Sequence, residues 1–285
     1  MSAADRETPV TTRESRPASE ISAGTHAGSP ARSAPELYGT IVIVGGGCYG
    51  SYYLRQLARA ASAGALAWGR LIVVDRDPEC RAAREPADGV EVVIRDWAAF
   101  FAEFLAAAAV DPGSATSDAI VPSPLMPHLL FDWVVERSRT MWPGRRVAVR
   151  PLGEPPNIPW QRSSPDGNTH YVSFAEWMCP INCIEPARCP ATRGPRSWTM
   201  PQALAEYVGT ERARGHNVAG PFVFHCTHRA YGVGMIDVSS VVHADAAIRE
   251  LAERGPADII VGTVSHCHGA IGRLEIGGSV PIPPT

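Results

Sequence analysis

The feature that most constrains the fold is a glycine-rich turn directly after an apolar strand. Residues 40–44 (TIVIV) are β-branched throughout, which is typical of a strand buried on both faces of a parallel sheet. Gly45, Gly46, Gly47 and Gly50 follow at once. Glycines so placed allow a tight turn, a close backbone approach to a bound group and close packing of the next helix. The sequence therefore predicts a strand–turn–helix unit.

Helices and strands alternate after this turn. Apolar periodicity predicts strands over 71–74, 90–94, 119–121 and 146–149, and helices over 52–63, 97–110 and 128–137. Further helices are expected over 202–214 and 244–254, and further strands over 221–224 and 258–264. Because crossover helices connect parallel strands, we expect a doubly wound, mostly parallel α/β sheet that continues into an α/β C-terminal part.

The second strand ends in a residue suited to nucleotide binding. The carboxylate of Asp75 can accept hydrogen bonds from both ribose hydroxyls of an NAD-like nucleotide. Arg76 beside it keeps NADP as an alternative, because it can pair with a 2′-phosphate. The free N–H groups and positive end of the helix after the turn favour a pyrophosphate.

Over residues 38 to 125, the order of strand, glycines, helix, strand and acid resembles Rossmann-type NAD-binding domains, most nearly those of the TrkA-N kind. The resemblance implies a Rossmann-like fold and a bound dinucleotide. One departure is Leu54, where the family usually has alanine or glycine. The residues expected to hold the dinucleotide are Gly45, Gly46, Gly47, Cys48, Tyr49, Gly50, Asp75 and Arg76.

A proline-stiffened loop carries three further cysteines. Cys179, Cys183 and Cys189 lie within eleven residues in a C-x3-C-x5-C pattern, which is typical of thiolates around a metal. The spacing matches neither a zinc ribbon nor a bacterial ferredoxin. The prolines after Cys179 and Cys189 are similar to those of ferredoxin loops, so we favour an iron–sulfur cluster over zinc.

Two strand endings supply candidates for the missing ligand. In HCTH (225–228), alternation places Cys226 and His228 on one face. In SHCH (265–268), it places His266 and His268 on one face and Cys267 on the other. Either group could complete the cysteine site or form a second one. Alternatively, these are buried small residues and strand caps with no ligand.

Composition excludes several kinds of chemistry. All 26 basic residues are arginine, so lysine-dependent Schiff bases, pyridoxal phosphate attachment and Walker-type phosphate binding are excluded. A net charge of -3 favours neither nucleic acid nor an anionic membrane as partner. No stretch is apolar enough for a signal peptide or a membrane span, and we expect a cytoplasmic protein whose seven cysteines are not paired in disulfides.

These patterns predict three regions. Residues 1–36 are expected to be a disordered tail, residues 37–150 a Rossmann-type domain, and residues 151–285 a Cys/His-rich α/β region in which Gly153 to Pro201 is irregular. Residues 279–285 are expected to trail off. Within the irregular part, Thr199 is predicted to cap the helix that follows.

Three functional hypotheses follow. The first is an NAD(H)-binding oxidoreductase or electron-transfer protein with a cysteine-ligated centre and a small-molecule or protein redox partner. The second is a non-catalytic sensor of nucleotide or redox state, of the TrkA-N kind. The third is a zinc-dependent hydrolase or lyase on a Rossmann scaffold. The sequence is compatible with a homo-oligomer and does not identify a substrate.

Overall fold

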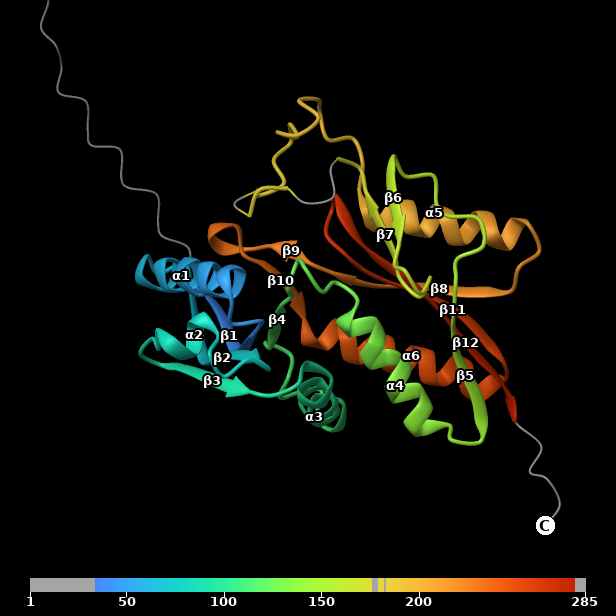
Figure 1. Ribbon diagram of the computed structural model, residues 1–285, viewed down its shortest axis with the longest axis horizontal. Coiled ribbons are helices and arrows are strands. Elements are labelled where there is room, and N and C mark those ends of the chain that lie inside the picture. Colours follow the sequence, from blue (N-terminus) through green and yellow to red (C-terminus); the bar gives the residue numbers. More distant parts are fainter. Residues whose placement is uncertain (1–33, 176–178, 182, 280–285) are drawn as a thin grey trace, which may run out of the picture. The chain divides into compact units, whose positions relative to one another are not determined.

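The computed structural model describes residues 34–175, 179–181 and 183–279, which form two mixed sheets (Figure 1). The first sheet has the order β3-β2-β1-β4-β10-β9. Its β1, β2, β3 and β4 are parallel, whereas β10 is antiparallel to β4 and β9 is antiparallel to β10. The strands are β1 (Glu36–Val44), β2 (Leu66–Asp75), β3 (Val90–Ile94), β4 (Ala119–Val121), β9 (Thr227–His228) and β10 (Gly234–Asp237).

The second sheet is mainly antiparallel. Its order is β6-β7-β12-β11-β8, and β5 also pairs with β12. β11 and β8 run parallel, and the other pairs are antiparallel. The strands are β5 (Arg145–Arg150), β6 (Trp160–Ser163), β7 (His170–Ser173), β8 (Val218–His225), β11 (Ala257–Val264) and β12 (His268–Ser279).

Helices cover both faces of each sheet. In β1, Ile41 and Ile43 pack with α1, whereas Val42 and Val44 face a core that includes α3. This second core also contains buried residues of α4, α6 and the second sheet, so those helices are shared by the two sheets. α5 covers the other face of the second sheet. The helices are α1 (Cys48–Ser62), α2 (Arg81–Arg84), α3 (Trp97–Val110), α4 (Leu129–Met141), α5 (Met200–Ala213), α6 (Val238–Arg254) and the 3-10 helix η1 (Ala230–Gly232).

The expectation of an α/β chain is confirmed. The doubly wound, mostly parallel arrangement is not confirmed, because the chain forms two mixed sheets and only β1 to β4 and the β8–β11 pair run parallel. β3, α3 and β4 have the predicted bounds, and Thr199 Oγ1 accepts a hydrogen bond from Gln202 N at 3.3 Å as the predicted cap. The sheets do not follow a boundary at residue 150, because β5 pairs with β12 and β10 returns to β4. All described residues lie in one compact unit that starts at Ala34.

The predicted tail is too long by at least one residue. Glu36 begins β1, pairs with Leu66 in the sheet and accepts a hydrogen bond from Arg229 at 2.7 Å. Residues 1–33, and the predicted C-terminal trail from residue 280 onward, lie outside the described residues. Within the part of the chain that is described, no helix is long and apolar enough to cross a membrane.

A pair of glycine variants tests the packing of the turn. A Cβ on Gly50 would lie 1.8 Å from the carbonyl oxygen of Gly45, whereas a Cβ on Gly47 would meet nothing within 4 Å. We therefore expect Gly50→Ala to lower the free energy of unfolding by roughly 1–3 kcal/mol, because the helix must move off the strand. Gly47→Ala should change it by less than about 0.5 kcal/mol. Urea denaturation of both variants measures the difference. Equal free energies of unfolding for the two variants would contradict the close packing of Gly50 against Gly45.

Candidate functional site

The glycine turn leaves the start of α1 open. Gly45 has φ +89°, a left-handed conformation that favours glycine, and its N–H donates to Val74 O at 2.8 Å. Gly47 precedes α1 and no side chain caps the free N–H groups of the first helical turn. Because a side chain at Gly47 would point into open space, a ligand can approach these N–H groups closely.

Asp75 has a structural role in this turn. One carboxylate oxygen accepts a hydrogen bond from Gly46 N at 2.6 Å, and the other accepts from Asp77 N at 2.9 Å. The residue is buried, and these two hydrogen bonds hold the turn in place from its protein-facing side. The predicted contact with a ribose stays a prediction. Arg76 lies over the ring of Trp97, with 4.9 Å from its Cζ to the ring centroid.

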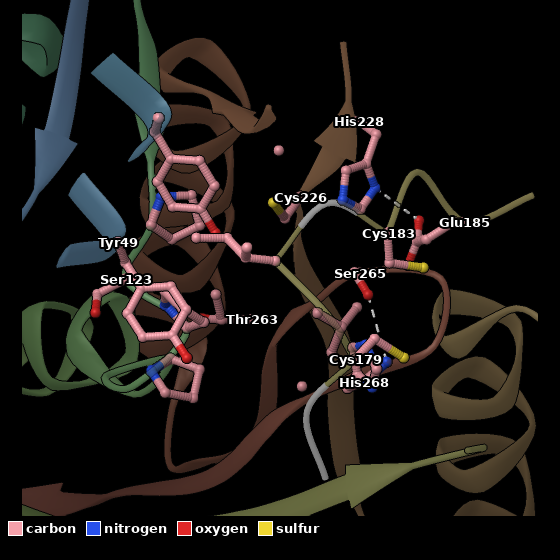
Figure 2. Close-up of a pocket in the computed structure, with 18 of the residues that line it drawn as sticks. Tyr49, Ser123, Cys179, Cys183, Glu185, Cys226, His228, Thr263, Ser265 and His268 are labelled. Carbon is pink, nitrogen blue, oxygen red and sulfur yellow. Dashed lines mark hydrogen bonds and ion pairs between the residues drawn. The ribbon is translucent and has the colours of Figure 1, made fainter. Parts of the chain in front are cut away.

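A cavity of about 160 Å³ lies between the first turns of α1, which follow the glycine turn, and the cysteine- and histidine-bearing segments (Figure 2). Tyr49 and Tyr53 of α1 and the Pro122–Pro124 segment after β4 form its apolar wall. Its other lining residues come from the connection before α4, the cysteine loop, the residues around β9 and β10, and the adjoining ends of β11 and β12. They are Pro127, Cys179, Pro180, Ile181, Cys183, Glu185, Cys226, His228, Gly234, Thr263, Val264, Ser265, His268 and Gly269.

The predicted thiols divide into two groups. Cys179, Cys183 and Cys226 line the cavity, whereas Cys189 and Cys267 are buried and do not. Burial raises the pKa of Cys226 to about 12. Burial, together with the nearby thiols of Cys183, Cys267 and Cys189, raises the pKa of Cys179 to about 12 as well. These two thiols are therefore protonated at neutral pH.

Four histidines lie on the side of the cavity that the cysteines line, or just behind it. His268 lines the cavity, and its Nδ1 lies 3.2 Å from Ser173 Oγ. His228 also lines it and bonds through Nδ1 to Glu185 Oε2 at 3.1 Å. His266 does not line it, but its Nδ1 lies 3.6 Å from the same oxygen. The rings of His225 and His266 lie 5.0 Å apart, and burial and the charge of His266 lower the pKa of His225.

Glu185, which the sequence offers as a candidate second-shell or proton-transfer group, is buried beside these histidines. It belongs to the cysteine loop, its side chain is 7% exposed, and its Oε1 has no hydrogen-bond partner among the described residues. Burial acts to raise its pKa, but hydrogen bonds from His228 and Ser265 and the charges of His228 and His266 outweigh it and lower the pKa to about 2. The signal available in the sequence was an acid inside the C-x3-C-x5-C loop.

The structure thus brings part of the predicted metal set to one cavity. Cys179, Cys183, Cys226, His228 and His268 share it, and Cys189, His266 and Cys267 lie outside it. Among the residues that the structure describes, no three His, Cys, Asp or Glu side chains converge closely enough to hold a metal ion. Metal binding at these residues stays a prediction, and it would require the side chains to rearrange.

Comparison with known proteins covers the C-terminal half. Residues 130–277 match the family model AF_1314_C, described as an uncharacterized protein's C-terminal domain, and the chain belongs to this family. The match extends from α4 to β12 and includes the cysteine loop and both histidine-bearing strand endings. No curated protein and no solved structure matches the chain with significance.

The buried Glu185 carboxylate makes stability depend on pH. Its pKa is lowered from 4.5 to about 2 in the folded protein, so the unfolded state takes up this proton first as the pH falls. Its stabilisation, roughly 3 kcal/mol, is therefore complete above pH 4.5 and is lost between pH 4.5 and about 2. The difference in unfolding free energy between wild type and Glu185→Gln, measured in urea, should shrink over that range. A constant difference would contradict this assignment.

Proposed function

We propose that the protein is an NAD(H)-binding redox protein in which the cavity joins the dinucleotide to a cysteine-ligated centre. The observation that carries the proposal is the composition of the cavity wall. Tyr49 and Tyr53 come from the helix after the glycine turn, and the thiols of Cys179, Cys183 and Cys226 lie in the same lining. Of the residues predicted for the dinucleotide, Tyr49 alone lines this cavity, and it shares the lining with five of the residues predicted for the metal.

The strand order supports the nucleotide half of this proposal. The parallel strands have the order β3-β2-β1-β4. β2 and β3 are therefore added on one side of β1 and β4 on the other, so the strand order reverses between β1 and β4. In open α/β sheets of the Rossmann type, ligands bind at the carboxyl ends of the strands where such a reversal occurs. The glycine turn follows β1 directly, and the Pro122–Pro124 segment follows β4.

A dinucleotide placed by this rule would contact both the start of α1 and the cavity. Its pyrophosphate would contact the free N–H groups that follow Gly47, and its nicotinamide would enter the cavity. The prolines and tyrosines would exclude water and provide flat apolar surface against the ring. The nicotinamide supplies a two-electron hydride exchange when bound.

The opposite wall has the donors of a soft metal centre. Thiolates and imidazoles suit an iron–sulfur cluster or zinc, and three thiols and two imidazoles line the cavity. Because the pKa values of the Cys179 and Cys226 thiols are raised, a metal must displace their protons. Metal uptake should therefore be weaker at low pH.

A non-catalytic sensor is the second candidate. The observation that favours it is the absence, in the described residues, of three donors that already converge on a metal. A site that assembles only when a metal or a nucleotide binds would couple occupancy to a change of structure. The same elements, β9, β10 and the cysteine loop, would transmit that change to a partner.

Binding of the dinucleotide is tested by calorimetry. Wild-type protein titrated with NAD, NADH and NADPH should release or absorb heat with at least one of them. Gly47→Val should abolish binding while the circular dichroism spectrum stays unchanged, because the side chain would occupy only open space beside α1. No heat with any of the three at millimolar concentration, with folded protein, would contradict the proposal.

The metal centre is tested on protein purified without oxygen. Elemental analysis should find bound metal, and Cys179→Ser, Cys183→Ser and Cys226→Ser should each lose it. Cys48→Ser is the matched control, because Cys48 is exposed and does not line the cavity. A brown absorption that bleaches on reduction identifies an iron–sulfur cluster, whereas zinc has no visible absorption. Folded wild-type protein without metal would refute this half of the proposal.

A further inference from the structure

Glu185 occupies a costly position. It has φ 50°, which is unusual for a residue other than glycine, and its ionised carboxylate is buried. Backbone strain and the burial of charge both destabilise a fold unless neighbouring contacts compensate. The contacts that compensate here are two imidazoles, one from His228 in β9 and one from His266 before β12.

The hydrogen bond to His228 fixes which nitrogen of the ring carries the proton. Its Nδ1 lies 3.1 Å from Glu185 Oε2, and an ionised carboxylate can only accept. The proton of a neutral His228 ring must therefore be on Nδ1. This leaves a lone pair on Nε2, the nitrogen at the other side of the ring.

His228 Nε2 and the Cys226 thiol face the same space next to Gly234. A methyl group at Gly234 would lie 2.6 Å from Cys226 Sγ and 3.9 Å from His228 Nε2, so both atoms flank the space that this glycine leaves open. All three residues line the cavity. Figure 2 shows His228 between Cys226 and Glu185, with its hydrogen bond directed to Glu185.

We propose that Glu185 is a positioning residue that holds His228 in the Nδ1–H tautomer, so that the Nε2 lone pair and the Cys226 thiol form a donor pair in the cavity. Such a pair accepts a soft or borderline metal ion. Carboxylates that accept from the other ring nitrogen of a ligating histidine fix ring orientation and raise its basicity in metal sites. The role of the pair as metal ligands rests on the proposed function, whereas the tautomer itself does not.

Nitrogen NMR of the metal-free, nucleotide-free protein tests the tautomer directly. Protein labelled with ¹⁵N in its histidines is measured at pH 8.5, where an ordinary imidazole is neutral. His228, assigned by the signal that His228→Gln removes, should show a protonated Nδ1 and a bare Nε2. The exposed His243 of α6 is the internal control and should show the opposite, ordinary tautomer.

Two variants of Glu185 separate positioning from packing. Glu185→Gln retains an acceptor oxygen and should keep His228 in the Nδ1–H form. Glu185→Met preserves the side-chain volume without an acceptor, and the ratio of the tautomers should shift toward Nε2–H by about tenfold or more. A contribution from packing alone predicts no shift with methionine.

The outcome that overturns the proposal is an Nε2–H tautomer of His228 in folded wild-type protein, or an unchanged tautomer in folded Glu185→Met. If the methionine variant does not fold, the wild-type spectrum alone decides. Because no metal or nucleotide is present, a failure here is distinct from a failure of calorimetry or metal analysis. Those experiments can fail while the predicted tautomer is observed.

Discussion

The site depends on the pairing of β10 with β4. β10 is antiparallel to β4, with Ile236 opposite Ile120, and Val238 N donates to Asp118 O at 2.9 Å just beyond the paired strands. Arg229 reinforces this return by donating two hydrogen bonds of 2.8 Å to the carboxylate of Asp237. These contacts bring a late segment of the chain, with Cys226 and His228, beside the helix that follows the glycine turn.

Local patterns predicted the elements whose own side chains decide their structure. The helix 97–110 and the strands 90–94 and 119–121 were predicted with their observed bounds, because apolar periodicity and the flanking polar residues are local. The long strand β12 was missed because glycines interrupt it. Gly272 packs against the Phe131 ring, 2.4 Å from where a Cβ would be, and a Cβ on Gly269 would lie 2.4 Å from Thr263 O. These requirements are tertiary, so the sequence pattern does not show them.

The sequence indicated which three segments contribute to the candidate site, but not which of their residues meet. The cysteine loop and the two histidine-bearing strand endings were expected to converge, and five of the eight residues do line one cavity. The burial of Cys189 and Cys267 depends on long-range packing, as does the contact of Glu185 with two imidazoles. The structural role of Asp75, the predicted ribose acceptor, could not be read from the sequence. Its carboxylate accepts the hydrogen bond from Gly46 N only when the strand and the turn are both folded.

The central claim is that one cavity serves both the dinucleotide and the thiol and imidazole groups. The most direct test is a crystal structure of the protein with NADH, grown without oxygen. We expect the pyrophosphate against the N–H groups after Gly47 and the nicotinamide in the cavity, between Tyr49 and Cys226. A dinucleotide bound with its nicotinamide outside this cavity would contradict the account.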